Sequence, residues 1–163
     1  MLVGIATDHG GFALKEELVA KLGAAAHEVV EFGAPEGNPG DDCPGYVVPL
    51  AHAVATGNVE RRVAICRSGV GASVCADKVQ GDRAALIHDH VSAKQGVEDD
   101  HMRITGVGGR TAGPSVAGDL LQTFSAAECS HADRHQRRLD KVPLVEAERI
   151  SDAQQVAAAP CET

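Results

Sequence analysis

The stretch that decides the fold is RVAICRSGVG, residues 62–71. Arg62–Cys66 is a short aliphatic run, which is typical of a strand buried in a parallel sheet. Residues 67–71 contain two glycines and lead into a helix that we expect over about 72–78. A strand that passes through a glycine-containing turn into a helix predicts one βα unit of an α/β fold.

The same alternation continues on both sides of that unit. Further strands are expected at Leu2–Thr7, His27–Phe32, Arg83–His88 and Ile104–Val107. Further helices are expected after Gly11, over about 44–55, from about 89 to 98, over 114–124 and over about 133–149. Pro49 either interrupts the second of these helices or marks its true start. Five strands alternating with helices predict a doubly wound parallel sheet in a single domain, residues 1–150, followed by an Ala- and Gln-rich tail, 151–163, that we expect to be disordered.

The composition narrows the class of protein. Aromatic residues make up only 2% of the chain, so its core has to be built from aliphatic side chains. The net charge of -8 disfavours nucleic acids and acidic membranes as partners. Five cysteines without a CxxC pair indicate reduced thiols and a reducing compartment. Because we see neither a signal peptide nor a membrane-spanning stretch, we expect a cytoplasmic protein.

Ligands of doubly wound sheets bind beyond the carboxyl ends of the strands. That rule selects the polar or glycine-rich segments Asp8-His9, Cys66–Gly71, His88–His90 and Gly108–Arg110. His88 and His90 could form a metal pair, but no third ligand is identifiable, so polar strand-end residues are the favoured interpretation and no metal is expected. The glycines of the first and last segments do not match a dinucleotide fingerprint, so no cofactor is expected either.

The Cys66–Gly71 segment is the strongest of these signals. A Cys that opens a turn into a helix faces backbone N–H groups, which can hold a thiolate or another anion. A buried structural Cys in a tight turn is an equally good interpretation of the spacing alone. The segment is not a Walker A motif, and Ala72 stands where a cysteine phosphatase would have an Arg.

Two other segments carry groups that could bind a hydroxyl group or a phosphate, or could have a structural role. Asp8 could receive a hydroxyl and His9 could contact a phosphate, although an N-cap is the simpler interpretation of this pair. Arg134 and Arg138 lie four residues apart on one helix face, so that both could bind one phosphate. A solvated basic face with ordinary ion pairs is the alternative for these arginines.

Taken together, these segments resemble the type B ribose-5-phosphate isomerase family, which includes galactose-6-phosphate and tetrose-phosphate isomerases. The resemblance covers residues 2 to about 142 and rests on TDHGGFALKEEL (7–18), ICRSGVGASVCADKVQGDRAALIHD (65–89), GVGGR (106–110) and RHQRRLDKV (134–142). It implies a Rossmann-like fold, a homodimer or tetramer with active sites shared between subunits, and an isomerase domain over residues 1–150.

The resemblance also implies a mechanism. An isomerase of this kind moves a proton between C1 and C2 of an open-chain sugar phosphate through a cis-enediolate. Cys66 would be the base, and Ser68 would stand beside the reacting oxygens. The backbone N–H groups that stabilise the enediolate would come from Ser68, Gly69, Val70 and Gly71. Asp8 would bind substrate hydroxyls, and the phosphate would be held by His9, Arg134 and Arg138, with Arg110 assisting.

The sequence departs from the family at two places. Where the family has His-Asn-Asp at the end of the fourth helix, with the His opening the furanose ring, this chain has Asp99, Asp100 and His101. Either His101 takes over, or Asp99 serves as acid and base, or the substrate is an open-chain tetrose phosphate that needs no ring opening. Arg67 replaces a family Gly and would add positive charge beside Cys66 or crowd the site. A non-catalytic sugar-phosphate-binding subunit of a hetero-oligomer is therefore the alternative function.

Overall fold

A computed structural model describes residues 1–33, 36–55 and 59–148 of the chain. Its centre is one parallel sheet of five strands in the order β2-β1-β3-β5-β4. The strands are β1 (Leu2–Thr7), β2 (Glu28–Glu31), β3 (Arg61–Cys66), β4 (Ala84–Leu86) and β5 (Ile104–Gly108). All five expected strands are confirmed, although β2 and β4 are shorter than the aliphatic runs that predicted them.

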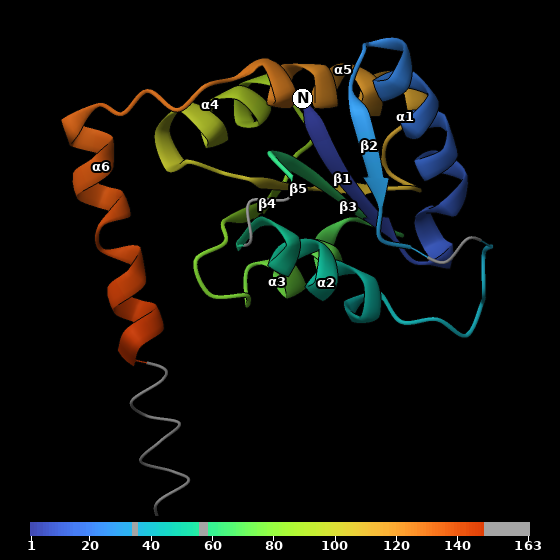
Figure 1. The fold of residues 1–163 in the computed structure, drawn as a ribbon, viewed down its shortest axis with the longest axis horizontal. Helices are drawn as coiled ribbons and strands as arrows, with labels where there is room; N and C mark the ends of the chain where they lie inside the picture. Colours follow the sequence, from blue (N-terminus) through green and yellow to red (C-terminus); the bar gives the residue numbers. More distant parts are fainter. Residues whose placement is uncertain (34–35, 56–58, 149–163) are drawn as a thin grey trace, which may run out of the picture. The chain divides into compact units, whose positions relative to one another are not determined.

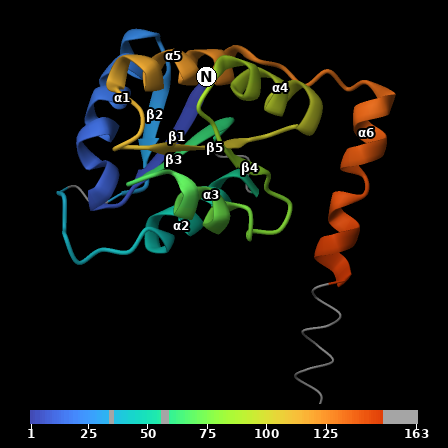
Figure 2. The ribbon, with the colours of Figure 1, turned by 180° about the vertical axis from the view of Figure 1, so that it is seen from behind.

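Helices cover both faces of this sheet, as Figure 1 shows and Figure 2 confirms from behind. They are α1 (Phe12–Ala24), α2 (Pro44–Ala55), α3 (Val70–Ala76), α4 (His90–Asp100) and α5 (Pro114–Ala126), with a short 3-10 helix at His9–Gly11. One face of the sheet packs Ile5 and Ile65 against α1 and α5, and the other packs Ala64 and Cys66 against α2 and α3. This alternation is the period of two expected of a strand buried on both faces. The doubly wound fold is therefore confirmed.

Two helix predictions need correction. Pro49 does not mark the start of α2, because it lies inside the helix that begins at Pro44. A proline there removes one hydrogen bond, and the exposed position lets water satisfy the carbonyl group that loses its partner. The predicted helix over 133–149 is also not continuous: α6 (Asp133–Leu139) ends at a turn, and helix resumes over 142–148.

The chain divides into two compact units, Met1–Cys129 and Ser130–Thr163. The first contains the sheet and α1 to α5, and the second contains α6 and the helical residues 142–148. The expected tail, 151–163, lies outside the described residues.

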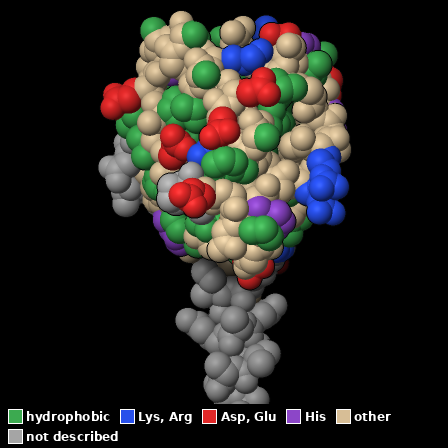
Figure 3. Space-filling view, turned by 90° about the vertical axis from the view of Figure 1, so that its right-hand side faces the viewer, with side chains coloured by type: hydrophobic (Ala, Val, Ile, Leu, Met, Phe, Trp, Pro, Cys, Tyr) green, Lys and Arg blue, Asp and Glu red, His purple; other side chains and the backbone are tan. Residues whose placement is uncertain are grey.

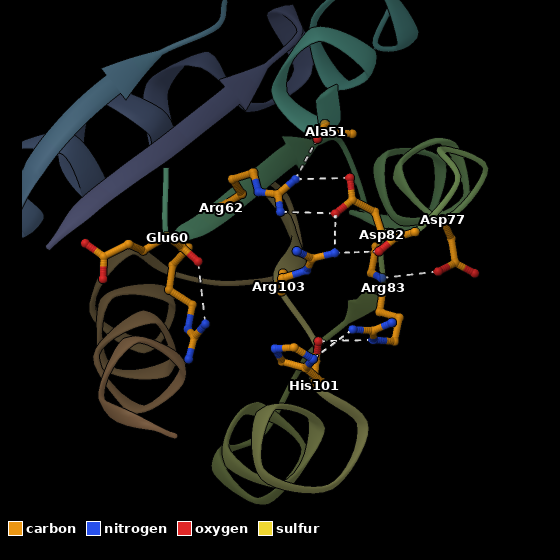
Figure 4. A network of polar contacts seen from close by, with 11 residues as sticks. Ala51, Glu60, Arg62, Asp77, Asp82, Arg83, His101 and Arg103 are labelled. Carbon is orange, nitrogen blue, oxygen red and sulfur yellow. Dashed lines mark hydrogen bonds and ion pairs between the residues drawn. The ribbon is translucent and has the colours of Figure 1, made fainter. Parts of the chain in front are cut away.

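The amino ends of the strands are held by a buried ion-pair network (Figure 4). The Arg62 guanidinium is 0% exposed and donates two hydrogen bonds to the Asp82 carboxylate, at 3.2 and 3.1 Å. It also donates to the carbonyl oxygen of Ala51 at 2.9 Å, and Arg103 lies 3.6 Å from Asp82. The network joins α2, β3 and the segments that precede β4 and β5, so it fixes the frame from which the opposite, carboxyl-end loops project.

Figure 3 shows acidic and basic side chains interspersed over one face, without a broad basic patch among its described residues. Within the described part of the chain, every helix is too short or too polar to cross a bilayer.

Candidate active site

The turn that follows β3 is built around the Cys66 sulfur. The backbone N–H of Gly69 donates to Cys66 Sγ at 3.1 Å, and the Cys66 residue is 7% exposed. Gly69 has φ of 81°, and a Cβ there would lie 2.5 Å from Leu86 Cδ1 and 2.9 Å from the Val107 carbonyl carbon. Only glycine fits this conformation and this space, so the turn directs an N–H at the sulfur.

Ser68 and Arg67 lie against the end of the neighbouring strand β5. The N–H of Gly109 donates to the Cys66 carbonyl at 2.8 Å, and the N–H of Arg110 donates to the Arg67 carbonyl at 3.0 Å. Ser68 packs over Gly108, where a Cβ would lie 2.6 Å from the Ser68 carbonyl carbon. Arg67 and Arg110 are both exposed. The two loops therefore place two cations on neighbouring strand ends, beside the buried thiol.

Asp8 and His9 complete this edge of the sheet. Asp8 caps the short 3-10 helix, because its Oδ1 accepts the N–H of Gly10 at 2.8 Å. Gly10 in turn packs against the backbone of Arg67, since a Cβ on it would lie 3.1 Å from the Arg67 nitrogen. The N-cap interpretation of Asp8 is thus confirmed, and the cap also brings Asp8 and His9 to the same edge as Cys66.

Asp41 holds His9, a role that the sequence reasoning missed. Its Oδ1 lies 2.7 Å from His9 Nδ1 and accepts the backbone N–H of His9 at 3.1 Å. Burial raises the pKa of the Asp41 carboxyl, but hydrogen bonds from the backbone and ring of His9 outweigh it and lower that pKa. Asp41 therefore carries its charge at neutral pH and orients the imidazole. Its only signal in the sequence is a place in the Gly- and Pro-rich loop after β2.

The end of α4 lies at the other edge of the sheet. Asp99 accepts a hydrogen bond from Gln95 Nε2 at 3.0 Å. His101 caps the helix with φ of 53°, and Arg83 binds both its ring Nδ1, at 2.9 Å, and its carbonyl, at 3.2 Å (Figure 4). Arg83 directly precedes β4, and His101 lies shortly before β5, so both residues lie at the amino ends of these strands. Cys66 lies at the carboxyl end of the sheet, on the opposite side. Within one chain, the structure does not bring Asp99, Asp100 or His101 to Cys66.

The second unit carries the paired arginines. Arg134 and Arg138 are exposed on α6, and Arg134 Nε donates to the ring of His135 at 2.8 Å. His135 is buried, and its Nδ1 lies 2.9 Å from Ser130 Oγ. The two arginines lie four residues apart on α6, which is the helical spacing that was predicted.

The His88–His90 segment has a structural role. Asp89 caps α4 through the N–H of Ser92 at 2.8 Å, and His90 Nδ1 lies 2.8 Å from Thr123 Oγ1. Asp89 and His90 therefore lie at the start of α4 and not at the end of β4, which ends at Leu86. The described residues contain no group of three side chains arranged to bind a metal ion.

The edge formed by Asp8, His9, Cys66, Ser68 and Arg110 can perform one kind of chemistry well. It offers a sulfur held by a backbone donor, further N–H groups at the start of α3, a hydroxyl, and cations for an anionic substrate. A proton acceptor beside preorganised donors suits reactions in which a carbon-bound proton leaves and negative charge develops on oxygen.

Known proteins are similar to this chain in sequence and in fold. Residues 3–142 match the family profile described as Ribose/Galactose Isomerase. Ribose-5-phosphate isomerase B of Mycolicibacterium paratuberculosis is 31% identical over 98% of this chain and 99% of its own length. The solved structure of ribose-5-phosphate isomerase B from Clostridium thermocellum is 35% identical, with a TM-score of 0.87 over 91% of this chain and 99% of that one. The type B enzyme of Trypanosoma cruzi is 37% identical, with a TM-score of 0.85 over 91% of this chain and 97% of that one.

The resemblance drawn from the sequence motifs is confirmed by these matches, because they cover both the sheet and the segment that contains α6. The chain therefore belongs to the Ribose/Galactose Isomerase family of enzymes.

Proposed function

We propose that this protein is an aldose–ketose isomerase for a small sugar phosphate, with Cys66 as its base. The observation that carries the proposal is the Cys66 sulfur itself, held by the Gly69 N–H at the carboxyl edge of the sheet. In the forward reaction the thiolate would take the proton from C2 of the open-chain aldose, and a cis-enediolate would form. Return of the proton to C1, with transfer of the hydroxyl proton from O2 to O1, would give the ketose and regenerate the thiolate.

Donors beside Cys66 would stabilise the enediolate. Ser68 would face the reacting oxygens, and the N–H groups of Ser68 and Gly71 would bind the negative oxygen as it develops. The Gly69 N–H donates to Cys66 Sγ and the Val70 N–H to Ser68 Oγ, so these two would hold the base and the hydroxyl in place. These donors belong to a turn fixed by the conformation of Gly69, so little reorganisation would be needed in the transition state. Asp8 would accept hydrogen bonds from substrate hydroxyls.

The phosphate would be bound by the cations around this edge. His9, oriented by Asp41, is one candidate, and the exposed Arg67 and Arg110 are two more. Arg134 and Arg138 on α6 would add a second pair. Contacts of this kind, remote from the reacting carbons, would position the sugar and supply binding energy for the reaction.

The proposal leaves two candidate substrates, a pentose phosphate and a tetrose phosphate. Relatives with ribose 5-phosphate in their names favour a pentose phosphate. The residues at the end of α4 favour an open-chain tetrose phosphate, because Arg83 occupies the Nδ1 atom of His101. For a pentose, Asp99 or His101 would have to open the ring, with Asp100 beside them. That role requires the α4 end of a second copy, so we propose a homodimer or tetramer with shared sites, acting in the cytoplasm.

A substrate panel tests this function. Purified protein would be assayed with four- to six-carbon aldose and ketose phosphates, with ribose 5-phosphate and erythrose 4-phosphate compared side by side. Strong preference for the pentose would contradict the tetrose proposal. If no sugar phosphate exchanges its C2 proton with solvent while binding persists, the protein is instead a non-catalytic binding subunit.

A further inference from the structure

Ser73 lies inside α3, just after the turn that holds Cys66, and it is a buried residue with 8% of its surface exposed. Its hydroxyl donates to the Gly69 carbonyl oxygen at 3.0 Å, and its backbone N–H donates to the same oxygen, also at 3.0 Å. A carbonyl oxygen has two lone pairs, so Ser73 supplies a donor for each of them. Because Gly69 is the N-cap of α3, these two bonds tie the Cys66 turn to the helix.

One peptide group transmits this contact to the polar atoms of the turn. The Gly69 carbonyl and the Val70 N–H belong to the same planar group, whose oxygen is bound by Ser73 and whose N–H donates to Ser68 Oγ at 3.4 Å. The preceding peptide group carries the Gly69 N–H, which donates to Cys66 Sγ at 3.1 Å. Rotation of the Gly69–Val70 group would change the backbone angles of Gly69, which has φ of 81°. The Ser73 hydroxyl therefore lies behind the hydrogen bonds to both Cys66 Sγ and Ser68 Oγ.

The neighbouring strand β5 leaves room for this contact at Gly106. A Cβ on Gly106 would collide with Ser73 Oγ and would lie 2.9 Å from the Gly69 carbonyl oxygen. All residues of β5 are buried, so this side of the contact is closed to water. A buried group that loses its hydrogen-bond partner then has no replacement. The space that the Ser73 hydroxyl and the Gly69 carbonyl need explains why position 106 is a glycine.

We propose that Ser73 is a positioning residue of the active site. Its hydroxyl holds the Gly69–Val70 peptide group, so that the Gly69 N–H stays on the Cys66 sulfur and the Val70 N–H stays on the Ser68 hydroxyl. The inference rests on the proposed function, in which Cys66 is the base, and it gives Ser73 no contact with the substrate. A purely structural bond is the competing explanation, since Ser and Thr side chains in helices often bind the carbonyl four residues earlier.

Three variants remove, restore or displace the hydroxyl. Ser73→Ala removes it, and Ser73→Thr restores a hydroxyl that can reach the same carbonyl. Gly106→Ala keeps Ser73 but fills the space of its hydroxyl, so it should displace the contact from the side of the sheet. Far-ultraviolet circular dichroism and thermal melting would establish that each variant is folded and how stable it is.

Thr105→Val is the matched control. Thr105 precedes Gly106 in β5, is fully buried, and has a hydroxyl without a hydrogen-bond partner among the described residues. It is paired in register with Val63, and successive residues of a strand face opposite sides of the sheet, so its side chain points away from Ser73. The variant therefore removes a buried hydroxyl next to Gly106 without touching the contact.

The first readout does not depend on activity. The rate at which iodoacetamide alkylates Cys66 would be followed from pH 5 to pH 10 by peptide mass spectrometry. In Ser73→Ala and Gly106→Ala the midpoint should move up by about half to one pH unit, because the thiolate would keep only part of an N–H bond that is worth roughly one to two pH units when complete. Ser73→Thr and Thr105→Val should stay close to the wild type. The other titratable or charged side chains around Cys66 are the same in all of these proteins: Cys43, Tyr46 and Cys75 against its cluster, and Asp8 and Arg67 at the same edge of the sheet.

The second readout is the pH profile of kcat on the best sugar phosphate. In Ser73→Ala, kcat at neutral pH should fall by up to roughly tenfold, as expected for the loss of one hydrogen bond, while KM changes little. The acidic limb of the profile should move with the alkylation midpoint.

A Ser73→Ala variant that melts at a lower temperature but keeps the wild-type alkylation profile would overturn the proposal, because the bond would then be structural only. Where Ser73→Ala does not fold, Gly106→Ala compared with Thr105→Val decides by the same criterion. A shifted alkylation profile in a protein without isomerase activity would support the positioning of Cys66 while contradicting the proposed function, so the two failures are distinguishable.

Discussion

Removal of the Asp82 carboxylate should severely destabilise the fold. Arg62 is 0% exposed and Asp82 has a side chain that is 3% exposed, and the two form a bidentate pair. Burial lowers the pKa of Arg62, although the hydrogen bonds and charge of Asp82 oppose that effect. In Asp82→Ala the buried guanidinium would retain the Ala51 carbonyl but lose its counter-ion. Breaking a buried pair in this way costs roughly 3–5 kcal/mol, against a total stability of about 5–15 kcal/mol for a typical domain.

Urea denaturation followed by circular dichroism measures this loss. The matched control is Glu98→Gln, which breaks the exposed Lys94–Glu98 pair at 3.5 Å and should cost at most about 0.5 kcal/mol. The double variant Arg62→Met, Asp82→Leu should recover much of the stability, because well-packed apolar side chains can replace a buried ion pair. A loss below about 1 kcal/mol in Asp82→Ala would refute the reasoning that the pair is desolvated and necessary.

Three further predictions concern the edge that holds Cys66 and the helices around it. Gly69→Ala should lower the free energy of unfolding by at least roughly 1–3 kcal/mol, because residue 69 has a positive φ and the added Cβ would collide with Leu86. The control is Gly71→Ala, whose added Cβ meets no atom within 4 Å and which should be neutral or stabilising. Thermal melting measures both variants. Asp41→Asn should raise KM for the sugar phosphate, since His9 loses its orientation. Because the pKa of Asp41 is lowered in the folded protein, its contribution to stability is present above about pH 4 and is lost as the pH falls below that value. The difference in the free energy of unfolding between Asp41→Asn and the wild type should therefore shrink from about pH 6 to about pH 3. An unchanged difference would contradict the pairing of Asp41 with His9. Asp89→Ala should lower the melting temperature through loss of the α4 cap, and equal melting temperatures would count against this role.

Most of the fold could be predicted from the sequence because aliphatic runs and glycine turns are local signals. The run at 62–66 and the turn at 67–71 identified β3 and the start of α3 within two residues. The break between Leu139 and residue 142 has a signal that the sequence reasoning overlooked: Pro143 cannot continue the preceding helix and is tolerated in the first turn of the helix that resumes. Pro49 misled for the opposite reason, since a strong local signal was outweighed by the rest of α2.

The candidate site was predictable where its residues follow strands. Asp8, Cys66 and Arg110 lie at the carboxyl ends of β1, β3 and β5, which are neighbours in the sheet, so the topology alone gathers them. Asp41 was missed because its contact with His9 crosses from the loop after β2 to the end of β1. For His101, the spacing indicated a candidate but could not show its attachment to Arg83 at the opposite edge.

Proton exchange in heavy water tests the central claim, that Cys66 is the base, most directly. The wild-type protein would be incubated in D2O with the sugar phosphate that the substrate panel selects, and deuterium at the exchanging carbon would be measured by NMR. We expect incorporation with the wild type and a loss of at least roughly 10²-fold in Cys66→Ala, with binding of the sugar phosphate retained. Undiminished exchange in Cys66→Ala would contradict the account, because another group would then be removing the proton.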